Sequence, residues 1–218
     1  MNQLVFKFPF KTTYFEKDFF VSTNNFEAYK LIESWPKWAN KQINIFGPSG
    51  CGKTHLTNIL SKKLKVLSID ADSFDTKINN LVEKFDCLVL ENYNGNIDEN
   101  LLYTFINQVL QLNKSIIINS LKSIKNEKIE LVDLKSRLNS FLDVQIDLPT
   151  DDLIRVIISK TFSDKQIDLN NKNLEFIIKN IERSYEKIFK FIKDIDNISL
   201  STGKSININL IKKVLINE

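Results

Sequence analysis

The sequence of 218 residues has little of what marks several protein classes. Its two cysteines, Cys51 and Cys87, form no CxxC pair, which argues against a disulfide-stapled domain and a zinc site. There is no internal repeat and no low-complexity tract. No apolar run reaches the roughly 20 residues that a membrane span needs, and the N-terminus lacks a secretory signal pattern. We therefore expect a cytoplasmic globular protein with no membrane association.

The sequence also lacks a large excess of positive or negative charge. The chain has 30 basic and 27 acidic residues, and a net charge of +3 does not by itself indicate nucleic-acid binding. Arginine occurs only at positions 137, 155 and 183. Because a guanidinium is a rigid fork suited to phosphate and carboxylate, each arginine is a candidate functional residue. Apolar residues are abundant. They make up 43% of the chain and include 16 phenylalanines, which is enough for a sizeable core.

Short apolar runs alternate with helical patterns up to about residue 146. They predict five strands, at residues 43–46, 66–69, 87–90, 115–118 and 144–146. Helical spacing predicts helices from Asn24 or Asn25 to about Trp38, and at residues 54–64 and 101–112. Because short strands separated by helices are buried on both faces, this order predicts an α/β fold with a five-stranded parallel sheet.

The pattern changes at Pro149, a natural boundary that Thr150 or Asp151 follows as a helix N-cap. No strand pattern appears beyond it. Helical patterns cover residues 151–162, 171–181 and 185–198, and a last one begins near residue 209. We therefore predict a small all-helical C-terminal subdomain.

A phosphate-binding loop links the first predicted strand to the next helix. It fits the pattern G-x-x-x-x-G-K-[ST] and consists of Gly47, Pro48, Ser49, Gly50, Cys51, Gly52, Lys53 and Thr54. Its glycines let backbone N–H groups point at phosphate oxygens, and the N-terminus of the following helix adds positive potential. Lys53 is expected to reach the β- and γ-phosphates, and Thr54 to offer its hydroxyl to Mg²⁺. The complete pattern between a predicted strand and a predicted helix argues strongly against a chance glycine turn and predicts nucleotide binding.

The third predicted strand ends in an acid, Glu91, which an amide, Asn92, follows. Glu91 is a candidate ligand of the Mg²⁺ shell, and the alternative is an ordinary strand terminus. Hydrolysis usually needs a second carboxylate to orient the attacking water, and an amide cannot accept a proton from it. We therefore expect weak intrinsic ATPase activity.

Two more polar residues have both a functional and a structural interpretation. Asn119 could position a water or sense the γ-phosphate if its strand neighbours the first one, or it is a strand-end turn residue. Arg137 either forms a surface ion pair or reaches the nucleotide of a neighbouring subunit. An arginine in the second role can raise phosphoryl-transfer rates about 10³–10⁵-fold.

These segments together resemble the AAA+ module of the DnaA branch of P-loop NTPases. The resemblance rests on Lys53-Thr54-His55-Leu56, on Asp133-x-x-Ser136-Arg137-Leu138 and on the helices after Pro149. It covers nearly the whole chain. It is closer to the Hda-like regulators for two reasons: no DNA-binding helical domain follows, and the two acids that the family motif has at the end of the third strand appear here as Glu91-Asn92. It implies an N-terminal arm at residues 1–20, an AAA+ core at 21–148 and a helical lid at 149–218.

The resemblance also implies partners. Hda-like proteins dock on the DNA sliding clamp through an N-terminal peptide, which the sequence matches at Gln3, Leu4, Phe6 and Phe8. From the residues alone, a strand packed on the chain's own core is an equally good interpretation. Such proteins contact ATP-loaded DnaA and promote hydrolysis of its ATP, so DNA is reached only through partners. Arg137 matches the arginine that the family offers to the partner's nucleotide.

The protein's own ligand would be ADP or ATP with Mg²⁺, with ADP as a structural ligand in the family. The segment 21–25, including Asn25, matches the family's stretch near the adenine. One departure lies in the lid, where Glu186 stands in place of an arginine that contacts the phosphates. Either Arg183 or Lys187 substitutes for it, or the contact is lost.

Two other functions fit the sequence. One is a free-standing AAA+ ATPase, such as a loader or a transposition helper. The other is a clamp-tethered adaptor without a working nucleotide switch. Self-association into a homo-oligomer is compatible with each of them.

Overall fold

The structure, a computed structural model, describes residues 19–165, 167, 169–202 and 206–216. These residues divide into two compact units, with the boundary between Asp147 and Leu148. We call the first the core unit and the second the helical unit. Among the described residues, no helix combines the length and the apolar character that crossing a membrane requires.

The core unit is built on a five-stranded sheet in which all neighbouring strands are parallel, as predicted. The strand order is β2-β3-β4-β1-β5. The strands are β1 (Gln42–Phe46), β2 (Val66–Asp70), β3 (Cys87–Tyr93), β4 (Ser115–Ser120) and β5 (Leu142–Gln145). Every residue of β4 is buried, as are most of β3 and β1, which explains their continuous apolar runs. The carboxyl end of β1 therefore lies in the middle of the sheet, next to that of β4.

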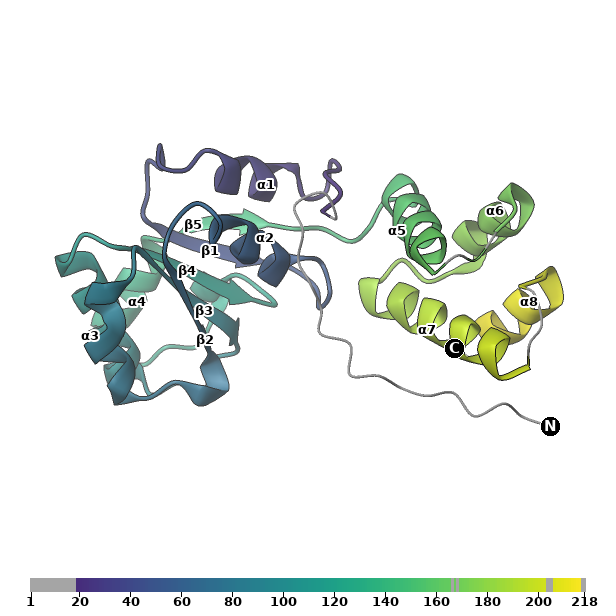
Figure 1. Cartoon of the computed structure of the whole chain (residues 1–218). Helices are drawn as coiled ribbons and strands as arrows, with labels where there is room; N and C mark the ends of the chain where they lie inside the picture. The colour runs from purple at the N-terminus through teal and green to yellow at the C-terminus, as the bar shows by residue number, and fades with distance from the viewer. Residues whose placement is uncertain (1–18, 166, 168, 203–205, 217–218) are drawn as a thin grey trace. The chain divides into compact units, whose positions relative to one another are not determined.

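Helices cover both faces of this sheet. Figure 1 shows α1 and α2 on one face and α3 and α4 on the other. These helices are α1 (Phe26–Glu33), α2 (Lys53–Leu60), α3 (Glu99–Gln111) and α4 (Val132–Asn139). Three 3₁₀ helices that the apolar pattern did not predict lie at Ala71–Ser73, Thr76–Lys84 and Ile124–Asn126. The layered arrangement is the α/β fold expected from the sequence.

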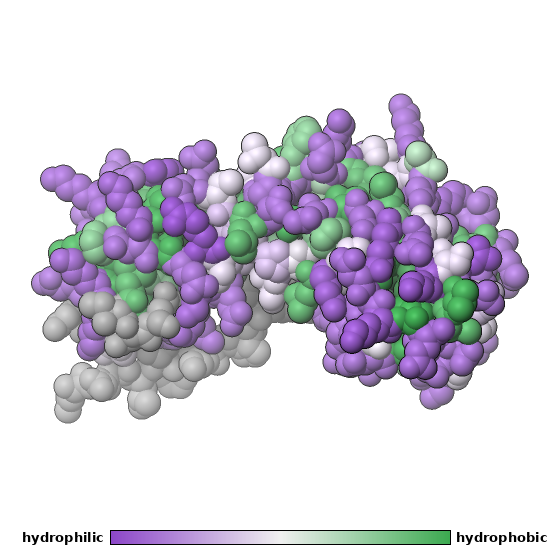
Figure 2. Space-filling model, turned by 180° about the vertical axis from the view of Figure 1, so that it is seen from behind, coloured by the Kyte–Doolittle hydropathy of each residue, from purple (hydrophilic) through white to green (hydrophobic). Residues whose placement is uncertain are grey.

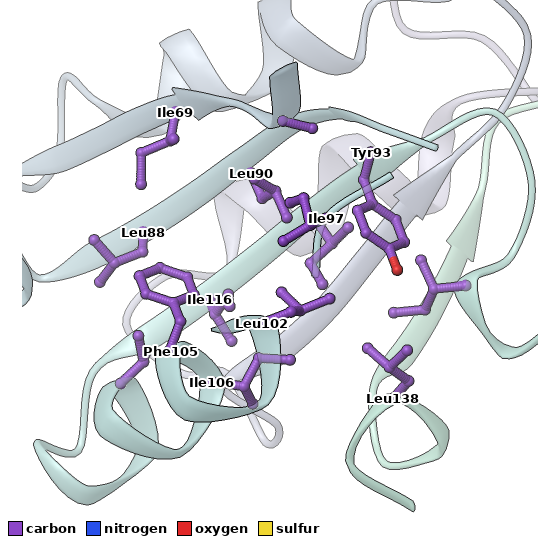
Figure 3. Close-up of a cluster of buried hydrophobic side chains, with 14 of the residues drawn as sticks. Ile69, Leu88, Leu90, Tyr93, Ile97, Leu102, Phe105, Ile106, Ile116 and Leu138 are labelled. Carbon is purple, nitrogen blue, oxygen red and sulfur yellow. The ribbon is translucent and has the colours of Figure 1, made fainter. Parts of the chain in front are cut away.

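Large apolar side chains fill the space between the sheet and α3. Figure 3 shows Leu102, Phe105 and Ile106 of α3 among side chains of the sheet that include Leu88 and Ile116. All five are at most 1% exposed. Fully burying one such side chain contributes about 1.5–3 kcal/mol, so this cluster holds the sheet in one arrangement.

Two helices of the core unit are shorter than the sequence pattern predicted. The first, α1, ends at Glu33 rather than near Trp38. Pro36 causes this, because proline has no N–H group and disfavours a helical conformation at the residue before it. The second, α2, ends at Leu60 rather than Leu64, where the chain tightens into turns with hydrogen bonds that span three residues.

The helical unit has its own apolar core. Its helices are α5 (Asp151–Asp164), α6 (Asn171–Asn180), α7 (Tyr185–Thr202) and α8 (Ile208–Ile216). As predicted, Thr150 caps the first of them: its hydroxyl accepts the N–H of Leu153 at 3.4 Å. Side chains at helical spacing, such as Ile154, Ile158 and Phe162 of α5, are buried against the other helices. Figure 2 shows that hydrophilic residues dominate the surface of both units in that view.

Candidate nucleotide-binding site

The glycine-rich loop lies between the end of β1 and the start of α2. Neighbouring strands fix its base: the N–H of Gly47 donates to the carbonyl of Ser120 at 3.2 Å, and the N–H of Ile146 donates to that of Phe46 at 2.8 Å. Gly50 and Gly52 have φ angles of 78° and 101°, a left-handed conformation that favours glycine. The backbone can therefore curl, which is the condition for turning N–H groups toward an anion.

Gly47 is required at its position because the backbone of residue 146 passes close by. A Cβ on Gly47 would lie 2.4 Å from the carbonyl oxygen of Ile146 and 3.2 Å from Cys51 Sγ. We expect Gly47→Ala to lower the free energy of unfolding by about 1–3 kcal/mol, as overpacking does, in urea titrations followed by circular dichroism. The exposed Ser49→Ala, in the same loop, should change it by less than about 0.5 kcal/mol. Equal stability of the two variants would contradict this close approach.

Lys53 directs its side chain back into the loop. Its ammonium donates to the carbonyl oxygens of Gly47 at 2.7 Å and Pro48 at 3.0 Å. The thiol of Cys51 lies 3.7 Å from the same nitrogen. Burial nevertheless raises the pKa of Cys51, although Lys53 opposes the shift. The thiol therefore stays protonated and fills the loop, while the ammonium is the positive charge that the loop presents.

Glu91 is the centre of a buried hydrogen-bond network. The residue is 8% exposed, and its carboxylate accepts three side-chain hydrogen bonds of 2.9 Å. Thr54 and Asn119 donate to Oε2, and Thr57 donates to Oε1. The structure thus brings together three residues that the sequence singled out, from the loop, β3 and β4. It adds Thr57, which the sequence analysis missed.

Asn119 reaches this network because β4 lies beside β1. Ile45 of β1 pairs with Asn119 in the parallel register, and the Asn119 side chain is fully buried. Its Nδ2 donates to Glu91, while its Oδ1 has no hydrogen-bond partner among the described residues. Asn119 is therefore part of the cluster beside the loop and not a solvated turn residue.

Asn92 does not share the site of Glu91. The strand β3 continues to Tyr93, beyond the predicted end, and its pairing with β4 is irregular between Leu90 and Tyr93. Asn92 has a φ of 58° and an exposed side chain, whose Nδ2 donates to Asp70 Oδ2 at 2.7 Å. The Asn92 amide is therefore bonded to Asp70 of β2 and not to the hydrogen-bond network of Glu91.

The residues present are of the kind that a magnesium ion prefers. Thr54 Oγ1 and Glu91 Oε2 lie 2.9 Å apart, and hydroxyl and carboxylate oxygens are hard ligands. Within the described part of the chain, no group of three or more His, Cys, Asp or Glu side chains could hold a metal ion. A hydroxyl and a carboxylate oxygen at this distance fit Mg²⁺ bound in the usual way, through one or two protein oxygens and the phosphates of a nucleotide.

Arg137 lies on the surface of the core unit. It lies in the last turn of α4, with an exposed side chain. The described residues offer its guanidinium no ion pair, in contrast to Arg155, which pairs with Glu175, and Arg183, which pairs with Asp151. The expectation of a surface ion pair for Arg137 is therefore not supported within this part of the chain.

Asn25 holds a turn together. Its side chain accepts the N–H of Ser22 and donates to the carbonyl of Phe20, both at 2.8 Å. It occupies the N-cap position of α1, as the sequence predicted, but its side chain makes no capping hydrogen bond. Both polar atoms of the Asn25 side chain thus bond within residues 20–25, and its contact with an adenine stays a prediction.

In the helical unit, Arg183 is engaged with Asp151 at the start of α5. Its Nε donates to Asp151 Oδ1 at 3.0 Å, and both side chains are about half exposed. Glu186 is exposed. The candidate clamp-binding residues Gln3, Leu4, Phe6 and Phe8 lie outside the described residues.

No protein-family model matches the chain. The chromosomal replication initiator protein DnaA of Borrelia duttonii (strain Ly) is 29% identical over 268 aligned residues, which cover 96% of this chain and 54% of that protein. The chain thus spans about half the length of the curated relatives that it matches.

Solved DnaA structures are similar in fold. The crystal structure of domain III of Thermotoga maritima DnaA superimposes with a TM-score of 0.78 at 20% identity and covers 96% of this chain and 98% of that one. The AMPPCP-bound DnaA of Aquifex aeolicus gives a TM-score of 0.70 at 22% identity, over 86% and 66% of the two chains. The chain therefore has the AAA+ fold of DnaA domain III, and its sequence is similar to those of DnaA proteins.

Proposed function

We propose that this chain binds ADP or ATP with Mg²⁺ at residues 47–54 and acts as an Hda-like regulator of a DnaA-type initiator. In this role it hydrolyses its own nucleotide weakly and promotes hydrolysis of the ATP that its partner holds. It docks on the DNA sliding clamp through residues 3–8 and reaches DNA only through its partners. That a DnaA of similar fold is bound to AMPPCP supports nucleotide binding by this chain.

The surroundings of Glu91 carry this proposal. Its carboxylate is bound by two hydroxyls and one amide, and the next residue, Asn92, is bonded to Asp70 instead. None of the groups bonded to Glu91 can take a proton from water at neutral pH. Such a site retains a nucleotide better than it cleaves one, which suits a protein whose nucleotide is structural.

Each residue of the loop then has a distinct task. Loop N–H groups and the N-terminus of α2 bind phosphate oxygens. The Lys53 ammonium exchanges the carbonyls of Gly47 and Pro48 for phosphate oxygens, which are stronger acceptors because they are charged. Thr54 and Glu91 would hold Mg²⁺, which when bound neutralises charge on the phosphates. Arg137, exposed on α4, is offered to the nucleotide of the partner.

A reconstituted hydrolysis assay tests this function. The full chain is added to ATP-loaded DnaA in the presence of sliding clamp and DNA, and release of phosphate from the DnaA-bound ATP is followed. We expect faster hydrolysis in the mixture and slow turnover by the chain alone. Fast turnover by the chain alone would favour a free-standing ATPase, and no acceleration of the partner would contradict a regulatory role.

Deletion of residues 1–8 should separate clamp docking from nucleotide binding. A few anchor residues carry most of the affinity at such an interface, at about 2 kcal/mol or more each, so we expect a loss of about 30-fold or more in clamp binding. Nucleotide affinity should stay unchanged. Surface plasmon resonance with immobilised clamp measures this, and Asn2→Ala is the matched control. Unchanged clamp affinity would instead assign the arm to the chain's own core.

A further inference from the structure

Thr57 is a polar residue on the buried face of α2. It lies among Leu56, Ile59 and Leu60, which are fully buried, and is itself 1% exposed. A hydroxyl in such a place costs free energy unless it is hydrogen-bonded. Two acceptors lie within reach of Thr57 Oγ1: Glu91 Oε1 at 2.9 Å and the carbonyl oxygen of Thr54 at 3.0 Å.

The hydroxyl of Thr57 has one proton, and it forms a stronger hydrogen bond with the Glu91 carboxylate than with the Thr54 carbonyl. A charged acceptor forms roughly twice as strong a hydrogen bond as a neutral one. The Thr54 carbonyl also already accepts Asn58 Nδ2 at 2.7 Å. Glu91 Oε1, in contrast, receives only the Thr57 hydroxyl among the side-chain donors of the described residues, whereas Oε2 receives both Thr54 and Asn119.

This division gives the two oxygens of Glu91 different roles. Oε2 faces the loop threonine that would bind the metal, and Oε1 is the point at which the carboxylate is held. A glutamate has one more rotatable bond than an aspartate, and each rotamer that must be fixed costs free energy. Without an anchor on Oε1, the carboxylate could rotate away from Thr54.

We propose that Thr57 is a positioning residue that holds Glu91 for Mg²⁺ at the phosphate loop. This inference rests on the proposed function, because it assigns Thr57 to the metal-dependent part of nucleotide binding. Thr57 touches neither nucleotide nor metal and acts only through Glu91. Loss of a hydrogen bond to a metal ligand typically lowers metal affinity by about 10–100-fold.

The test is a Mg²⁺ titration of the full chain saturated with fluorescent ADP, beside ADP binding in EDTA. We expect Thr57→Val to raise the Mg²⁺ concentration at half-saturation about 10-fold or more and to leave ADP affinity in EDTA within about twofold of wild type. Thr104→Val is the matched control, because its hydroxyl donates to the carbonyl of Asn100 on α3, away from the loop.

A second pair of variants keeps the test independent of packing. Thr57→Ser and Thr57→Ala both lose the methyl group, and only Thr57→Ser keeps the hydroxyl, so Thr57→Ser should retain the Mg²⁺ midpoint and Thr57→Ala should lose it. Equal Mg²⁺ midpoints in both, with ADP binding intact, would overturn the positioning role alone and leave Thr57 a packing residue. Absence of ADP binding by the wild-type chain would overturn the proposed function and this inference together.

Discussion

Arg137→Ala is expected to abolish the stimulation of DnaA-bound ATP hydrolysis while leaving the chain's own nucleotide binding intact. An arginine supplied in trans stabilises the charge that develops on the transferred phosphoryl group, and it is worth about 10³–10⁵ in rate. Arg137 can serve in this way because it is exposed and has no ion-pair partner among the residues described. The measurement is single-turnover hydrolysis of ATP preloaded on DnaA.

Two controls accompany Arg137→Ala: a neighbouring exposed lysine of α4 replaced by alanine, and Arg137 itself replaced by lysine. Lys135→Ala removes a neighbouring exposed charge of α4 and should stimulate like wild type. Arg137→Lys keeps the charge but loses the planar fork, so we expect it to recover only part of the rate. Clamp binding should be equal in all three variants. Normal stimulation by Arg137→Ala would show that another group reaches the partner's nucleotide.

Lys53→Ala should reduce the affinity for ADP and ATP by about 30-fold or more. Removing one member of a desolvated charge pair costs about 2–5 kcal/mol, and each 1.4 kcal/mol is a factor of ten in affinity. The Lys53 ammonium also lies inside the loop, where it donates to the carbonyl oxygen of Gly47 at 2.7 Å. Isothermal titration calorimetry measures the affinity of wild type and variant.

A lysine at the other end of α2 provides the matched control. Lys62→Ala removes an exposed ammonium just beyond Leu60 and should leave nucleotide affinity unchanged. Circular dichroism should show the same fold for both variants. If Lys53→Ala bound ADP like wild type, the loop would not be the phosphate site, and a passive adaptor would become the better account.

The sequence predicted the features that depend on local pattern. The glycine-rich loop and the apolar periodicity of strands and helices are local, so the five-stranded sheet and the helical unit could be derived before the structure was known. The position of Asn119 beside the loop depended on strand order, which the apolar pattern does not encode. The pairing of Ile45 with Asn119 in adjacent strands provides it.

Features that depend on tertiary contacts were harder to predict from the sequence. The extension of β3 to Tyr93 follows from the pairing of Tyr93 with Ser120 of β4, and the left-handed backbone of Asn92 lies where this pairing is irregular. Thr57 was missed because the helix at residues 54–64 was predicted from the spacing of its apolar residues alone. A polar residue one turn after Thr54 was the signal that could have revealed it, since Glu91 lies opposite both.

Equilibrium titration of the wild-type chain with ADP and with ATP, each with Mg²⁺ and in EDTA, tests the central claim most directly. We predict saturable binding to a single site, tighter with Mg²⁺ and dependent on Lys53. A chain that bound neither nucleotide at millimolar concentration in either condition would contradict a nucleotide site at Gly47–Thr54, and with it the regulatory role built on that site.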